Sequence, residues 1–177
     1  MVAYRGSKKF AELTAWDFIE TDSPGFDIVI LCPPMTFGPI AHPITRASQL
    51  NESNSQLWKV ASGAPLPVSR VPFWVDVRDL AAMHVESLLK PEAGGKRYIP
   101  TSPERFSYGL VAEIIRSEFP WAESNGVREE TQQIDESYGL DGETAARELG
   151  LQYRGFRKSV VDLVKQVWEM EEKSEET

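Results

Sequence analysis

One short apolar segment limits the folds open to this chain more than any other feature. Residues 27–32 read Asp-Ile-Val-Ile-Leu-Cys, with Gly25 before them and Pro33-Pro34 after them. A run that is apolar at successive positions, rather than at alternate ones, is typical of a strand buried on both faces of a parallel sheet. Residues 7–20 carry apolar side chains at helical spacing and predict a helix. A helix followed by such a strand is half of a βαβ unit, so the expected fold class is α/β.

The rest of the chain alternates predicted helices with short predicted strands. Strands are expected over residues 71–75 and 97–100, and helices over residues 56–62, 77–90, 107–119, 141–149 and 156–172. Asp76 is followed three positions later by Asp79, which predicts a variant of the capping box, and Ser107 and Asp141 are expected to cap the helices that they precede. Residues 36–70 form a long irregular stretch whose scattered apolar side chains favour an ordered, functional loop.

Composition and charge argue against several kinds of partner. The net charge of −8 disfavours nucleic acid and anionic membranes, and residues 169–177, with five glutamates and one lysine, contribute 1 − 5 = −4 of it as a predicted acidic tail. Cys32 is the only cysteine, so no intrachain disulfide is possible and a cytoplasmic location is expected; we interpret it as a small core residue. The sequence has neither a signal peptide nor an apolar run of the roughly 20 residues that a membrane span needs. His42 and His84 are too far apart to suggest a metal site.

Two residues near the start of the chain indicate proton-transfer chemistry. Tyr4 and Lys8 are four residues apart, so on a helix they lie one above the other on the same face. An ammonium beside a phenol favours the phenolate and should lower the pKa of the tyrosine, which makes it a usable general acid near neutral pH. Reduction of a carbonyl needs such a group, because the oxygen must gain a proton when hydride reaches the carbon. A pair of this kind is, taken alone, more often a solvated helix face.

Three segments together resemble consecutive signatures of one enzyme family. They are Tyr4-x-x-Ser7-Lys8-x-x-Ala11-Glu12, Pro33-x-x-Thr36-Phe37-Gly38-Pro39 and Val75-Asp76-Val77-Arg78-Asp79-Leu80-Ala81. The chain is similar to the extended short-chain dehydrogenase/reductases, an epimerase/dehydratase-like superfamily, and within it to the fungal aldehyde and methylglyoxal reductases and the dihydroflavonol reductases. The resemblance covers nearly all of the 177 residues, which correspond to the C-terminal half of the family's chain. It implies the C-terminal part of a Rossmann-type, doubly wound parallel sheet with a small α/β substrate-binding lobe.

The resemblance also implies a role for each matched residue. Tyr4 would be the proton donor, and Lys8 would lower its pKa and hold the ribose hydroxyls next to the nicotinamide. Pro33 would contact the nicotinamide ring, Thr36 stands where the family usually has valine, and Ser53 would lie near the cofactor or the substrate. Two simpler interpretations stay open, in which Pro33 only ends a strand and Ser53 only caps a helix. The same resemblance would assign the substrate pocket to residues 36–70 and 98–106, while Asp76 and Asp79 would be caps rather than catalytic carboxylates.

The chain lacks the glycine-rich turn that lets backbone approach a pyrophosphate. It contains no Gly-x-Gly, and Gly150 and Gly155 have the outer spacing of a phosphate loop but Phe156 where a lysine is required. Nor is the family's catalytic serine present upstream of Tyr4. We therefore expect residues 1–39 to be the end of a dinucleotide-binding domain. Residues 40–168 are expected to form a mixed substrate-binding region, in which 71–90 return to the Rossmann sheet.

The sequence thus predicts a fragment of an NAD(P)H-dependent ketone or aldehyde reductase, with NADP favoured over NAD by the resemblance. The expected partner is a small-molecule carbonyl substrate, without nucleic acid, membrane or metal, and the chain by itself is expected to be inactive. Exposed sheet edges would let copies self-associate. Two alternatives stay open: an inactive truncated paralogue that serves as an interaction or regulatory module, and a nucleotide-sugar epimerase. The segments Leu140-Asp141 and Glu148-Leu149-Gly150-Leu151, which match the reductase subgroup, argue against the epimerase.

Overall fold

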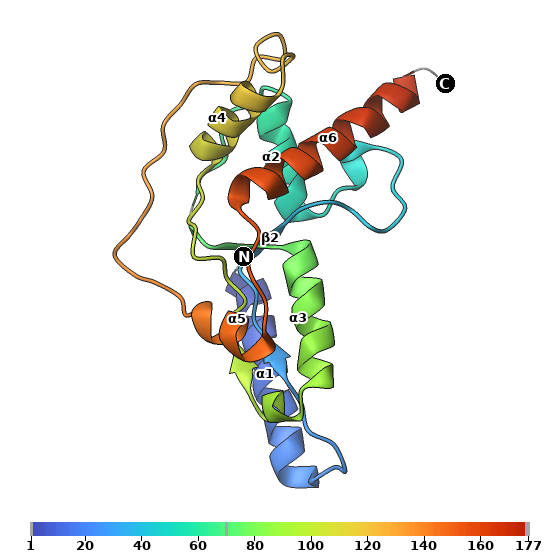
Figure 1. The fold of residues 1–177 in the computed structure, drawn as a ribbon, viewed down its shortest axis with the longest axis vertical. Coiled ribbons are helices and arrows are strands. Elements are labelled where there is room, and N and C mark those ends of the chain that lie inside the picture. Colours follow the sequence, from blue (N-terminus) through green and yellow to red (C-terminus); the bar gives the residue numbers. More distant parts are fainter. Residues whose placement is uncertain (1, 70, 176–177) are drawn as a thin grey trace.

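The computed structural model describes residues 2–69 and 71–175. Its elements in chain order are α1 (Val2–Asp22), β1 (Ile30–Leu31), β2 (Met35–Phe37), η1 (Ala47–Gln49), α2 (Glu52–Ala61), β3 (Trp74–Asp76), α3 (Val77–Leu89), η2 (Pro91–Ala93), β4 (Arg97–Tyr98), α4 (Tyr108–Glu118), α5 (Glu143–Leu149) and α6 (Phe156–Glu175). Figure 1 shows an elongated molecule with an upper lobe, formed by α2, α4 and α6, and a lower lobe, formed by α1, α3, α5, β1 and β4. No helix in the described part of the chain is long and apolar enough to cross a membrane.

The strands are parallel, as the sequence predicted, but they are short. β1 pairs with β4, with Ile30 opposite Arg97, and β2 pairs with β3, with Thr36 opposite Val75. The prediction that residues 28–32 are buried on both faces is wrong for this chain, because all five are only half-buried. A parallel strand is buried when it has strands along both edges and helices over both faces. Within the described residues, β1 has one neighbouring strand, so part of its surface stays open.

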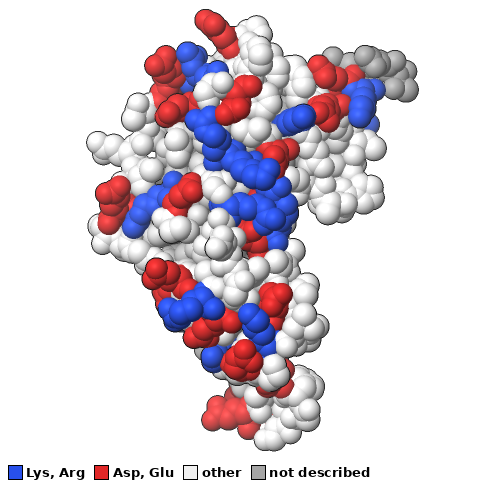
Figure 2. All heavy atoms as spheres, viewed as in Figure 1, with Lys and Arg blue, Asp and Glu red and all other residues white. Residues whose placement is uncertain are grey.

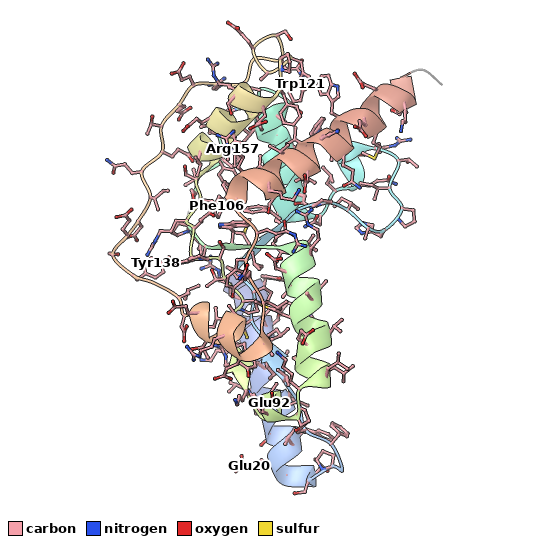
Figure 3. The ribbon with its side chains drawn as sticks, in the orientation of Figure 1. Glu20, Glu92, Phe106, Trp121, Tyr138 and Arg157 are labelled. Carbon is pink, nitrogen blue, oxygen red and sulfur yellow. The ribbon has the colours of Figure 1, made fainter. Side chains whose placement is uncertain are left out.

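The main hydrophobic core lies in the upper lobe. α2, α4 and α6 meet there over β2 and β3, and an aromatic cluster fills the centre. Phe106 packs edge-on against Phe37, with ring centroids 4.9 Å apart, and Trp74 packs against Phe156 at 4.8 Å. Figure 3 shows Phe106 beside the start of α6. Tilted and edge-on aromatic pairs of this kind add about 0.5–1.5 kcal/mol each to the stabilisation that comes from burial alone.

The lower lobe has a much smaller core. Its fully buried apolar side chains come from α3, η2, β4 and α5 and are Met83, Ala93, Tyr98, Ala145 and Leu149. Helix α1 adds no buried residue to this core. Instead Phe10 and Leu13, which the sequence pattern assigned to the inner face of a helix, are 67% and 51% exposed. The lower lobe therefore presents an apolar helix face to solvent.

Most of the predicted helices are present, and side chains cap several of them as expected. Ser107 caps α4 by accepting a hydrogen bond from the Leu110 N–H at 3.1 Å. The N-cap of α5 is Gly142 and not the predicted Asp141, although the Asp141 carboxylate accepts from the Thr144 N–H at 3.0 Å. Gly150 ends α5 with a φ of 73°, in the left-handed region that glycine tolerates best. α2 begins at Glu52, four residues before the predicted start at residue 56.

The predicted acidic tail, residues 169–177, is helical as far as residue 175. α6 runs through it as far as Glu175, and the Glu171 carboxylate accepts a hydrogen bond from the Ala47 backbone N–H. The last two residues of the tail, 176–177, and Arg70 at the end of the predicted loop lie outside the described residues. Figure 2 shows acidic and basic side chains mixed over most of the visible face, and pairs such as Arg157–Glu118 and Arg78–Asp162 join them.

Candidate active site

Tyr4 and Lys8 lie on the first turns of α1 and face solvent. The Lys8 Nζ is 5.6 Å from the centroid of the Tyr4 ring, as expected for residues one helical turn apart. The Tyr4 side chain is 64% exposed, and Lys8 is exposed as well. Between them, the Ser7 hydroxyl donates to the Tyr4 carbonyl oxygen at 2.7 Å, inside the helix. The phenol and the ammonium are therefore both open to a ligand.

Helix α1 is fastened to the carboxyl end of β1 through Glu12, one turn beyond Lys8. Glu12 accepts hydrogen bonds from the Cys32 thiol at 3.4 Å and from the Arg97 Nε at 2.6 Å. The Arg97 guanidinium is the main reason that the pKa of Glu12 lies below its usual value, while burial raises the pKa of the Cys32 thiol. Cys32 is thus a half-buried partner of Glu12 and not the enclosed core residue that the sequence predicted.

This contact joins the helix that carries Tyr4 and Lys8 to Cys32, the residue that follows β1. The chain turns back after α1, so β1 runs in the opposite direction beside it (Figure 1). Pro33, which is exposed, directly follows Cys32 in the chain and so lies one residue beyond this contact.

Thr36 and Ser53, the other predicted cofactor residues, are brought together by β2 and α2. Ser53 does not cap α2; its hydroxyl donates to the Thr36 carbonyl oxygen at 2.5 Å. The next residue, Asn54, was missed by sequence reasoning. Its buried amide bonds both backbone groups of Gly38, accepting from the N–H at 3.2 Å and donating to the carbonyl at 2.9 Å. The available signal was its position, because Asn54 lies on the apolar face of α2 with Leu57 and Ala61.

The chain is similar to known fungal reductases along almost its whole length. It is 39% identical over 173 residues to the ketoreductase azaE of Aspergillus niger, covering 92% of this chain and 50% of azaE. It is 30% identical over 183 residues to the NADPH-dependent methylglyoxal reductase GRE2 of Saccharomyces cerevisiae, covering 96% of this chain and 52% of GRE2. The crystal structure of yeast Gre2 complexed with NADPH matches with a TM-score of 0.80 at 28% identity, over 97% of this chain and 52% of that one.

These similarities agree with a C-terminal fragment of an enzyme of the short-chain dehydrogenase/reductase type. Alfalfa vestitone reductase, at 20% identity and a TM-score of 0.67, has the same fold over 94% of this chain. No family model matches the sequence. The chain spans about half the length of the curated relatives that it matches. That share agrees with the half-length correspondence predicted from the three signatures.

The carboxylates of the third signature, Asp76 and Asp79, have structural roles in this chain. Asp76, fully buried, caps α3 by accepting from the Arg78 N–H at 2.8 Å and also binds the Arg78 guanidinium and the Ser159 hydroxyl. Burial alone raises the pKa of Asp76, but the hydrogen bonds from Arg78 and Ser159 outweigh it and lower the pKa. The predicted capping box is wrong in its second half, because Asp79 instead binds the backbone N–H and guanidinium of Arg154.

The described residues of the upper lobe form two open clefts. One, of about 530 Å³, lies between residues 42–45 and the end of α6, and the other, of about 620 Å³, lies between α4 and residues 128–134. Neither includes Tyr4, Lys8 or Pro33. Tyr98 and Phe106, the ends of a segment predicted to shape the pocket, are buried in the two cores. No cluster of metal-binding side chains occurs among the residues that the structure describes.

Proposed function

We propose that this chain is the catalytic half of an NADP(H)-dependent reductase that acts on ketones or aldehydes. The observation that carries the proposal is the exposed Tyr4–Lys8 pair, on a helix that the Glu12–Cys32 contact joins to the residue before Pro33. The relatives support it, since azaE is described as a ketoreductase and GRE2 as an NADPH-dependent methylglyoxal reductase. NADP is favoured over NAD because GRE2 is described as NADPH-dependent and its structure is a complex with NADPH.

The residues present fit the nicotinamide end of such a cofactor. They include the exposed phenol of Tyr4, the exposed ammonium of Lys8 and the exposed Pro33, and Ser53 fixes the backbone of Thr36. The pyrophosphate is a different matter, because the sequence holds no Gly-x-Gly turn for it. The fit therefore concerns Tyr4, Lys8, Pro33, Thr36 and Ser53, and leaves the phosphate cradle to another part of the enzyme.

These side chains have separate tasks in the proposed reaction. A bound, reduced nicotinamide supplies hydride to the carbonyl carbon. Tyr4 donates its hydroxyl proton to the carbonyl oxygen as negative charge develops there, so that the carbonyl becomes an alcohol. The Lys8 ammonium stabilises the phenolate that is left and holds the ribose hydroxyls. Pro33, Thr36 and Ser53 keep the nicotinamide beside the tyrosine.

Replacing the proton donor in a full-length form tests the proposal. Such a form places the half of a relative that this chain does not cover, for example that of azaE, in front of this chain. Tyr4→Phe should lower turnover about 10²–10⁴-fold and leave NADPH affinity nearly unchanged, because only the transferred proton is lost. Lys8→Ala should weaken both. Steady-state kinetics and cofactor titration separate the two effects.

A second tyrosine provides the control. Tyr138 is exposed and packs against Phe73, away from the site, so Tyr138→Phe should leave turnover unchanged. Near-normal turnover in Tyr4→Phe would show that Tyr4 is not the proton donor. A correctly folded full-length form without any reductase activity would favour the interaction-module alternative instead.

A further inference from the structure

Asn54 makes a contact that neither the proposed chemistry nor helix capping explains. Its side chain is 4% exposed, yet it is an amide with donors and an acceptor that must all be satisfied. It bonds both the N–H and the carbonyl of a single residue, Gly38, at 3.2 and 2.9 Å. A neighbouring strand would form the same two hydrogen bonds with its backbone, whereas here a single helical side chain forms both.

The contact completes the second edge of β2. The Met35 N–H donates to the Phe73 carbonyl at 3.3 Å, so the backbone groups of Met35 face β3. Backbone groups alternate along a strand, and those of Thr36 and Gly38 consequently face the opposite edge. Ser53 and Asn54, consecutive residues in the first turn of α2, bond to Thr36 and Gly38 there. The segment from Thr36 to Gly38 is thus fixed from both sides.

We propose that Asn54 is a positioning residue for the nicotinamide. By fixing the Gly38 peptide it sets the path of the backbone through Thr36, beside which the nicotinamide is proposed to bind. Asn54 touches no cofactor in this scheme and acts only through Gly38. The inference rests on the proposed function, since it names what the fixed segment is for.

Gln166 provides a matched comparison within the same molecule. Its side-chain amide accepts from the Ile40 N–H at 2.7 Å and donates to the Ile40 carbonyl at 2.8 Å. The contact has the same chemistry as that of Asn54, but it fixes a residue two positions further from Thr36. Substitution of Asn54, but not of Gln166, should therefore affect nicotinamide binding. If the substitutions only loosened the chain in general, both would have the same effect.

The two amides are best replaced by the carboxylates of equal size. In Asn54→Asp the oxygen that accepts from Gly38 N–H is kept, and the donor is replaced by an oxygen that repels the Gly38 carbonyl; Gln166→Glu makes the same change at Ile40. In the full-length form we expect Asn54→Asp to weaken NADPH binding about tenfold, as the loss of one positioning hydrogen bond does. Binding of adenosine 2′,5′-bisphosphate, which lacks the nicotinamide, should not change. Gln166→Glu should change neither.

A second measurement uses this chain as it stands. Amide hydrogen exchange at residues 36–38 should become at least several-fold faster in Asn54→Asp. In Gln166→Glu the exchange rates of these residues should stay unchanged. Melting curves show whether Asn54→Asp folds. If it does not, Asn54→Gln takes its place. This variant keeps both hydrogen-bonding groups and should restore part of the NADPH affinity.

The outcomes separate this inference from the function on which it rests. Equal loss of NADPH and adenosine bisphosphate binding, or unchanged NADPH binding in Asn54→Asp, would overturn the positioning role. Near-normal turnover in Tyr4→Phe would overturn the proposed reaction whatever Asn54 does. A selective loss of NADPH affinity together with faster exchange at residues 36–38 would establish the role.

Discussion

At the scale of single residues, Asp76 illustrates how much and how little a sequence pattern reveals. Its place before α3 predicted a cap, and the hydrogen bond from the Arg78 N–H confirms that prediction. Its bond to Ser159 could not be predicted, because 83 residues separate the two and no local pattern connects them. Asp79 shows the opposite case, since it fits the local pattern of a cap but its carboxylate is taken by Arg154.

Acid should destabilise the chain through Asp76. The folded-state pKa of Asp76 lies below its ordinary value of 3.8, so its contribution to stability is complete above about pH 4 and is lost as the pH falls through the folded-state value. The pKa values of Glu12 and Asp162 are also lowered in the folded chain, so both carboxylates add to the loss of stability in acid. We expect Asp76→Asn to lower the free energy of unfolding by about 3 kcal/mol at neutral pH, since Arg78 loses its buried partner. The free energy of unfolding of this variant should then fall less steeply as the pH is lowered.

Urea unfolding at several pH values between 2 and 7 measures both effects. Ser159→Ala is the milder companion, because it removes one hydrogen bond and keeps Arg78; it should cost about 1 kcal/mol and move the acid transition to higher pH. If Asp76→Asn and the unchanged chain lost stability in parallel below pH 4, the acid sensitivity would belong to other carboxylates.

At the scale of elements, long-range contacts decide most of what the sequence left undetermined. Caps and apolar spacing predicted α3 and α4 to within about one residue at each end. β1 was predicted over more residues than it has, because its pairing depends on neighbouring strands and not on its own composition. The early start of α2 depends on Ser53 and Asn54 bonding to β2, a contact between segments that the sequence alone does not bring together.

The turn after β2 gives an element-scale prediction at Gly38. Its φ of 126° is rarely adopted by other residues, and an added Cβ would lie 3.1 Å from the Val77 Cγ1 and 3.2 Å from the Asp76 Oδ2. Gly38→Ala should therefore cost about 1–3 kcal/mol of unfolding free energy. Gly6→Ala, in α1 with open space around it, should instead be neutral or stabilise by up to about 1 kcal/mol. Thermal melts of the two variants compare them directly, and equal melting temperatures would contradict this account of Gly38.

At the scale of the whole molecule, the two lobes differ in how well they enclose their apolar surface. The upper lobe buries its aromatic cluster, whereas α1 exposes Phe10 and Leu13 and α3 exposes Leu88, whose side chain is 85% accessible. Exposed apolar side chains that gather on one face are typical of a site of association. The sequence predicted these faces as helical but could not show that little in the described chain covers them.

We expect the chain to self-associate in solution through α1. Replacing Phe10 and Leu13 together by serine should lower the mass measured by light scattering after size exclusion, because it removes two of the exposed apolar side chains of α1. Val68→Ser is the control, since Val68 is 76% exposed but lies in the loop before β3. A monodisperse monomer for the unchanged chain, with a cooperative thermal transition, would contradict the prediction.

The position of α6 has a consequence for how the protein is made. Its side chains Phe156, Val160 and Leu163 complete the main core, and Gln166 bonds a residue 126 positions earlier. Ribosomes add about 5–20 residues per second, so the segments that pack against α6, made roughly 40–120 residues before it, wait about 2–24 s for this partner. The main core of the upper lobe is therefore complete only once α6 has been made. A stop codon before Phe156 would leave a lobe that cannot fold, not a shortened one that can.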